Sequence, residues 1–159
     1  MEQQDSGSVI TDVIPLRLLK VSAIETGYAN TDFDLKSTSS FDTLHNELAS
    51  GCLVLHYGCG DDGHYHASYE FDHDGESTES GAERDILLII DVLNSLSEVA
   101  KRELESCYLR EFNVGFECGD SWAYVHSIPH HALAATANAG CSLAVTLYPM
   151  RHPDGKPRK

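Results

Sequence analysis

Two patterns of apolar residues alternate along the chain, one typical of helices and one typical of strands, and together they predict an α+β domain. The strongest helix is expected from Ala82 to Leu104, because apolar residues recur there every three or four positions. Ser80 and Glu83 have the spacing of a capping box, which predicts that this helix begins next to Ser80. The apolar stripe consists of Ile86, Ile89, Leu93, Leu96, Ala100 and Leu104, flanked by Ile90, Val92 and Val99.

A β-hairpin is predicted between Cys52 and Asp72, where apolar and polar residues alternate with a period of two. Residues 52–57 are expected as its first strand, 58–63 as a glycine-containing loop and 64–72 as the return strand. One face of the return strand carries Tyr65, Ala67, Tyr69 and Phe71, and the other carries His64, His66, Ser68, Glu70 and Asp72.

The remaining elements are predicted from weaker patterns. Residues 16–24 are expected as the first strand, and residues 41–48 as a short helix capped by Ser39 or Ser40. A second hairpin is expected from the strands 110–118 and 121–126, followed by a helix from Pro129 to Ala137 that ends at Gly140. Residues 141–148 are apolar on both faces, which predicts a strand in the centre of the sheet.

The predicted order is β-α-ββ-α-ββ-α-β, and its first six elements match the βαββαβ order of ferredoxin-like folds. We expect one domain over residues 9–150, with a disordered N-terminus over 1–8 and a flexible basic tail over 151–159. Helices are expected on one face of a mostly antiparallel sheet. The other face is then open to solvent, and we expect it to carry Glu70, Asp72, Glu111, Glu117 and the His64/His66 pair.

The charge of the chain indicates what kind of partner it has. The formal net charge is −14, and residues 1–150 contain 24 acids and 7 bases, so this part carries about −17. Such a surface disfavours nucleic acid and anionic membranes and favours a basic partner.

The acids gather between Asp61 and Asp85, a segment that contains nine acidic residues and only one basic residue, Arg84. A solvated acidic loop is one interpretation of this cluster. A docking surface for a cationic protein, with aromatic residues beside it, is the other. The candidate docking residues are Asp61, Asp62, Glu70, Asp72, Asp74, Glu76, Glu79, Trp122 and Tyr124.

The predicted hairpin also contains a candidate metal site. His56, Cys59, His64 and His66 could supply the four ligands of a tetrahedral zinc ion, as in a small zinc enzyme or sensor. A solvated strand face that is rich in histidine is the alternative, because the chain has no paired C-x-x-C motif. The five cysteines are expected to be free thiols.

We expect a cytoplasmic protein. The first six residues lack the basic and apolar regions of a signal peptide. The longest apolar run, from Ile86 to Ile90, is too short to cross a bilayer.

The C-terminal half of the chain, from about Ile86, resembles a family of small uncharacterised bacterial domains that are similar to immunity proteins encoded beside polymorphic and contact-dependent inhibition toxins. The resemblance is carried by the long apolar helix, the strand 111–116, the helix 128–134 and the final strand 140–148. It implies a protein that binds and neutralises a cognate toxin domain and that has neither catalytic activity nor a cofactor. The acidity favours a cationic toxin of the nuclease type. An acidic adaptor for another basic protein is the remaining alternative. The resemblance assigns no role to any individual residue.

Overall fold

The computed structural model describes residues 25–72, 81–120, 122–150 and 156. Five strands and four helices form in this part of the chain. In chain order they are β1 (Gly27–Ser37), α1 (Asp42–Leu48), β2 (Cys52–Cys59), β3 (Tyr65–Phe71), α2 (Ala82–Ser95), α3 (Glu98–Ser106), β4 (Leu109–Glu117), α4 (His130–Asn138) and β5 (Ser142–Tyr148).

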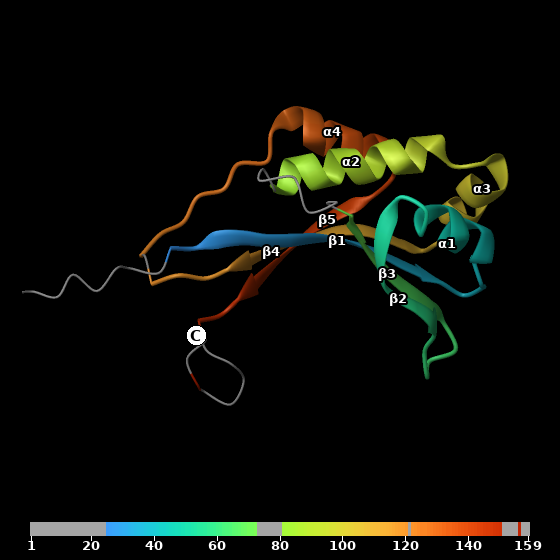
Figure 1. Cartoon of the computed structure of the whole chain (residues 1–159), viewed down its shortest axis with the longest axis horizontal. Coiled ribbons are helices and arrows are strands. Elements are labelled where there is room, and N and C mark those ends of the chain that lie inside the picture. The colour runs from blue at the N-terminus through green and yellow to red at the C-terminus, as the bar shows by residue number, and fades with distance from the viewer. Residues whose placement is uncertain (1–24, 73–80, 121, 151–155, 157–159) are drawn as a thin grey trace, which may run out of the picture.

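The strands form one sheet in the order β2-β3-β1-β4-β5. Neighbouring strands are antiparallel except β4 and β5, which are parallel. All four helices lie on one side of the sheet, where α2 contacts β1 and β3 and α4 contacts β5 (Figure 1). The predicted α+β class, with a mostly antiparallel sheet and helices on one face, is therefore confirmed.

The core lies between the sheet and the helices. Phe33 and Leu35 of β1 alternate with polar residues and are buried against the helices, as are Phe112 and Val114 of β4. The helices contribute the stripe that the sequence predicts, because Ile86, Ile89, Leu93, Leu96, Ala100 and Leu104 are all buried. Each fully buried Val, Leu, Ile or Phe side chain contributes about 1.5–3 kcal/mol relative to exposure.

The predicted helix from Ala82 to Leu104 is wrong in one respect, because it is two helices. Leu96 and Ser97 adopt extended backbone angles between α2 and α3. Ser97 caps α3 by accepting a hydrogen bond from the backbone N–H of Ala100 at 3.2 Å. The Glu47 carboxylate accepts from the Ser97 backbone N–H at 2.8 Å and from its hydroxyl at 2.6 Å. These bonds stabilise the break, since a serine competes well with helical hydrogen bonding.

Two predicted helix starts are also wrong. The N-cap of α1 is Phe41 rather than Ser39 or Ser40, and the N-cap of α2 is Gly81 rather than Ser80. Neither N-cap residue makes a side-chain capping bond. The buried Phe41 side chain fixes the start of α1 by packing against Tyr57, with ring centroids 5.2 Å apart. Tertiary packing therefore outweighs local capping here.

Two predicted strands differ from the structure. In the part of 121–126 that the structure describes, the chain is irregular rather than a hairpin arm. β5 lies at the edge of the sheet rather than in its centre, and Val145 and Leu147 are exposed. An apolar run therefore did not mean burial on both faces, because α4 covers only part of β5.

The first strand that the structure describes, β1, was not among the predicted elements. The predicted strand 16–24 and the N-terminal segment 1–8 lie outside the described residues, as does the tail 151–159 apart from Lys156. No helix in the described ranges is long and apolar enough to cross a membrane.

Candidate functional site: the open face of the sheet

The alternation of the strands sends every second side chain away from the helices. The register places Asp32 opposite Glu70 and Asn113, and Asp34 opposite Ser68 and Glu111. We call this surface the open face. It consists of Leu53 and His56 of β2, His66, Ser68 and Glu70 of β3, Asn30, Asp32, Asp34 and Lys36 of β1, Glu111 and Asn113 of β4, and Ser142, Ala144 and Thr146 of β5.

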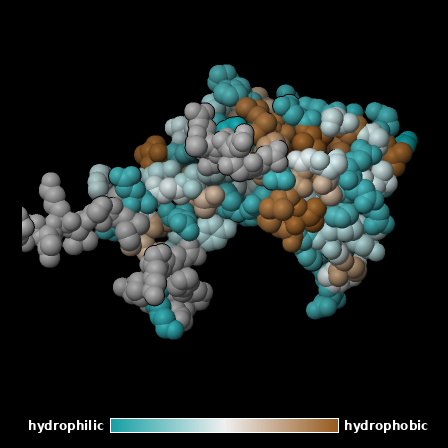
Figure 2. Space-filling view, in the orientation of Figure 1, coloured by the Kyte–Doolittle hydropathy of each residue, from teal (hydrophilic) through white to brown (hydrophobic). Residues whose placement is uncertain are grey.

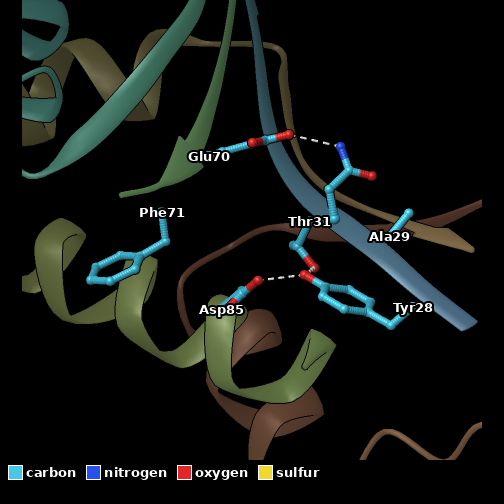
Figure 3. Close-up of a pocket in the computed structure, with 7 residues that line it drawn as sticks. Tyr28, Ala29, Thr31, Glu70, Phe71 and Asp85 are labelled. Carbon is cyan, nitrogen blue, oxygen red and sulfur yellow. Dashed lines mark hydrogen bonds between the residues drawn. The ribbon is translucent and has the colours of Figure 1, made fainter. Parts of the chain in front are cut away.

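The centre of the open face is a pair of carboxyl groups. Asp32 and Glu70 face each other across the β1–β3 register, and a proton on one of them can be shared with the other in a hydrogen bond. The side-chain amide of Asn30 donates to both, at 2.9 Å to Asp32 Oδ1 and 2.8 Å to Glu70 Oε1. Figure 3 shows Glu70 reaching toward β1 from the neighbouring strand, with its hydrogen bond to the side-chain amide on β1 drawn as a dashed line.

This arrangement raises the pKa of Asp32 to about 7. Partial burial is the main cause, followed by the hydrogen bond and the negative charge of Glu70 and then by the charge of Asp34. The Asn30 amide acts in the opposite direction, because it donates to the charged form. The Asp32–Glu70 pair therefore holds one proton in the pH range where most carboxyl groups have lost theirs.

A polar network continues from this pair toward the β5 edge. The Glu111 carboxylate accepts a hydrogen bond from the Ser142 hydroxyl at 2.9 Å. The Asn113 amide oxygen accepts from the Thr146 hydroxyl at 2.8 Å. The open face is therefore an ordered polar surface, with acceptor groups on β3, β1 and β4 and hydroxyl donors on β5.

Gly115 makes room for the Asn30 amide. A methyl group at Gly115 would overlap the Asn30 amide oxygen and would lie 2.9 Å from the ring of Tyr148. The absence of a side chain at Gly115 therefore lets Asn30 lie flat on the sheet and reach the two carboxyl groups.

A pocket of about 80 Å³ lies beside the carboxyl pair, where β3 ends and β1 continues. Figure 3 shows Tyr28 and Asp85 pointing toward each other across it. The Tyr28 hydroxyl donates to Asp85, and it lies 2.8 Å from Thr31 Oγ1. Burial and the bond to Asp85 raise the pKa of Tyr28, so this hydroxyl stays protonated and is not a base.

Exposed apolar side chains adjoin the acids of the open face. Leu53 is 48% exposed and is paired with Glu70, and Leu55, at the bulge in the β2–β3 ladder, is also 48% exposed. Figure 2 shows a brown hydrophobic patch over the β2 and β3 part of the sheet, with hydrophilic residues beside it. Carboxylates and apolar side chains therefore meet in one continuous region.

The four candidate zinc ligands do not meet at one point in the structure. His66 lies 3.1 Å and His64 4.0 Å from the Asp62 carboxylate, and His64 also lies 2.8 Å from the Tyr108 hydroxyl. Cys59 donates to the carbonyl of Gly60, and His56 is exposed on β2. Among residues 25–72, 81–120, 122–150 and 156, no group of three or more His, Cys, Asp or Glu side chains could hold a metal ion.

The candidate docking residues are also separated. Glu70 lies in the centre of the open face, whereas Asp61 and Asp62 lie in the turn between β2 and β3, and Asp72 follows β3. Tyr124 packs on the opposite side of the sheet against Phe116, with ring centroids 5.5 Å apart, and Trp122 is 99% exposed near it. Asp74, Glu76 and Glu79 lie outside the described residues.

The sequence prediction missed the acids of β1, Asp32 and Asp34. The signal was present, because Thr31, Phe33, Leu35 and Ser37 alternate with polar residues over the whole segment. Aspartate and asparagine are rare in strands, and two of the inward residues are small and polar, so the segment does not have the composition of a buried strand.

No protein family model, no functionally described protein and no solved structure matches this chain.

Proposed function

We propose that this protein is a non-catalytic immunity protein that uses the open face to bind and neutralise a cationic toxin domain of the kind that acts on nucleic acid. The observation that carries the proposal is the array of Asp32, Asp34, Glu70 and Glu111 on three adjacent strands. A toxin that acts on nucleic acid must present cations to the phosphate backbone. An ordered carboxylate surface has the complementary charge, and it accelerates the encounter through long-range attraction.

The apolar residues beside the acids support a protein partner. Protein interfaces combine a dehydrated apolar centre with a polar rim. Leu53 and Leu55 can supply such a centre, since both are half exposed and Leu53 is paired with Glu70. The charged groups then set the orientation and the rate of association.

We also infer that the first four strands follow the ferredoxin-like plan. The order β2-β3-β1-β4 with antiparallel neighbours, and helices between β1 and β2 and between β3 and β4, supports this inference. β5 extends the sheet beyond that plan and is parallel to β4.

The test is co-expression of this chain with the toxin domain encoded beside its gene, followed by measurement of growth and of the dissociation constant. The double variant Asp34→Lys/Glu111→Lys changes two acids of the open face. The matched control Asp91→Lys/Glu105→Lys makes the same change in net charge at two exposed residues of α2 and α3.

We expect the open-face variant to lose protection and to bind at least tenfold more weakly, which corresponds to about 1.4 kcal/mol. We expect the control to bind within about threefold of the unaltered protein, because only long-range attraction changes. Equal losses in both variants would mean that net charge alone acts. Full protection by the open-face variant would exclude this face as the docking surface.

A further inference from the structure

The carboxyl pair on the open face has a geometry that suits reversible protonation. Asp32 and Glu70 are directly opposed on adjacent strands, and one side-chain amide, that of Asn30, bonds to both at 2.8–2.9 Å. Two carboxylates this close repel each other, and a single shared proton removes that repulsion while forming a hydrogen bond between them.

The surroundings of the pair contain more negative than positive groups. On β1 the nearest charged group is Asp34, on β4 it is Glu111 beside the neutral Asn113, and on β2 the apolar Leu53 faces Glu70. On α2, Asp85 lies across the pocket from Glu70 and is bonded to Tyr28. The basic residue Lys36 pairs with His66, and this pair lies four register positions along β1 and β3 from the Asp32–Glu70 pair.

We propose that the Asp32–Glu70 pair is a protonation switch on the docking surface, which binds one proton below neutral pH and releases it above, so that affinity for a basic partner increases with pH. The functional part of this inference rests on the proposed docking role of the open face. Release of the proton changes the formal charge of the four carboxyl groups Asp32, Asp34, Glu70 and Glu111 from −3 to −4. The coupling is reciprocal, so a bound cation promotes release of the proton to the solvent. The pKa of Asp32, raised to about 7, is consistent with this role.

The first experiment needs no partner. Carbon-detected NMR follows the side-chain carboxyl carbons of Asp and Glu in the full chain between pH 4 and 9. Histidine side chains have no such carbon, so their signals do not overlap these. We expect one carboxyl group to titrate near pH 7 and its signal to be absent in Asp32→Asn. In Glu70→Gln the Asp32 pKa should fall by at least one unit, because the neighbouring charge is gone. In Asp34→Asn it should fall less. A protein in which every carboxyl group titrates below pH 5 has no such switch.

The second experiment uses decalysine as a cationic probe, because its side chains stay charged between pH 6 and 8. We expect the ratio of its affinities at pH 8 and pH 6 to be about threefold to tenfold larger for the unaltered protein than for Asp32→Asn. The variant keeps all the histidines, so their titration cancels in this comparison. Equal ratios in the two proteins would overturn the switch.

The two proposals can fail separately. If the carboxyl group titrates near pH 7 and decalysine shows the expected dependence, but the neighbouring toxin domain neither binds nor is neutralised, the immunity function is wrong and the switch stands. If the toxin binds through the open face with the same pH dependence in Asp32→Asn as in the unaltered protein, the immunity function stands and the switch is wrong.

Discussion

The two faces of the sheet are made by the same strands and differ in almost every physical property. On the covered face, Phe33 and Phe112 are fully buried with ring centroids 5.0 Å apart. On the open face, their neighbours Asp32, Asp34 and Glu111 are partly exposed and carry carboxyl groups. The alternation of the strand therefore separates the residues that stabilise the fold from those that present charge. Substitutions on the two faces should have largely independent effects.

The largest expected effect is on the covered face. Phe33→Ala should lower the free energy of unfolding by about 3–5 kcal/mol, because it leaves a cavity between β1 and the helices. Urea denaturation measures the loss. The next residue supplies the control, since Asp34→Ala removes an open-face side chain and should change stability by no more than about 0.5 kcal/mol. Similar losses at both positions would contradict the separation of the faces.

A smaller effect is expected where the open face is tightly packed. Gly115→Ala should destabilise the protein by about 1–3 kcal/mol, because the new methyl group displaces Asn30. Loss of the Asn30 bond should also raise the pKa of Asp32 further, since that bond favours the charged form. Denaturation and carboxyl NMR measure the two effects. Gly27→Ala is the matched control, as an added methyl group there has nothing within 4 Å. An unchanged Asp32 titration in Gly115→Ala would mean that Asn30 does not hold the pair.

The next prediction concerns the pH dependence of stability. The pKa of Asp32 is higher in the folded protein than in the unfolded chain, so its contribution to stability is present below about pH 4 and is lost as pH rises to about 7. Asp32→Asn removes this loss. It should be more stable than the unaltered protein by about 1 kcal/mol at pH 8, a value discounted for solvent screening, and the difference should shrink toward pH 4. Thermal melts at pH 5 and pH 8 measure it. A variant that is less stable at pH 8 would contradict the sign.

The smallest effect on stability is expected at the apolar part of the open face. Leu53→Ser should change the free energy of unfolding by less than about 0.5 kcal/mol, because the side chain is already half exposed. If Leu53 lies in the centre of a protein interface, the same variant should weaken toxin binding by about tenfold. Calorimetric binding and urea denaturation of the same preparation separate the two. Weaker binding accompanied by an equal loss of stability would indicate a structural role instead.

The covered face could be predicted from the sequence better than the open face. Large apolar residues at regular intervals identified the helix stripe, β3 and β4, and every residue of the stripe is buried. The break at Ser97 was not predictable from that stripe, because Glu47 of α1 stabilises it from a distant part of the chain. The position of β5 was not predictable either, since an apolar run does not reveal which strands will lie beside it.

The site was only partly predictable for a related reason. Glu70 and Glu111 were expected on the open face, and the structure places both there. The acidic cluster was expected between Asp61 and Asp85, whereas the described acids of the open face come from three separate strands. Their partner residues are set by the β1–β3 and β1–β4 registers, which depend on tertiary structure. The pairing of Asp32 with Glu70 is therefore visible only in three dimensions.

The edge position of β5 has a consequence for aggregation. Among the described strands β5 has no neighbour on its outer side, and Val145 and Leu147 are exposed along it. Such an edge can pair with the same edge of a second molecule. A net charge of −14 opposes that approach through repulsion between molecules. The acidity thus opposes self-association along β5, and added salt, which screens this repulsion, should favour it.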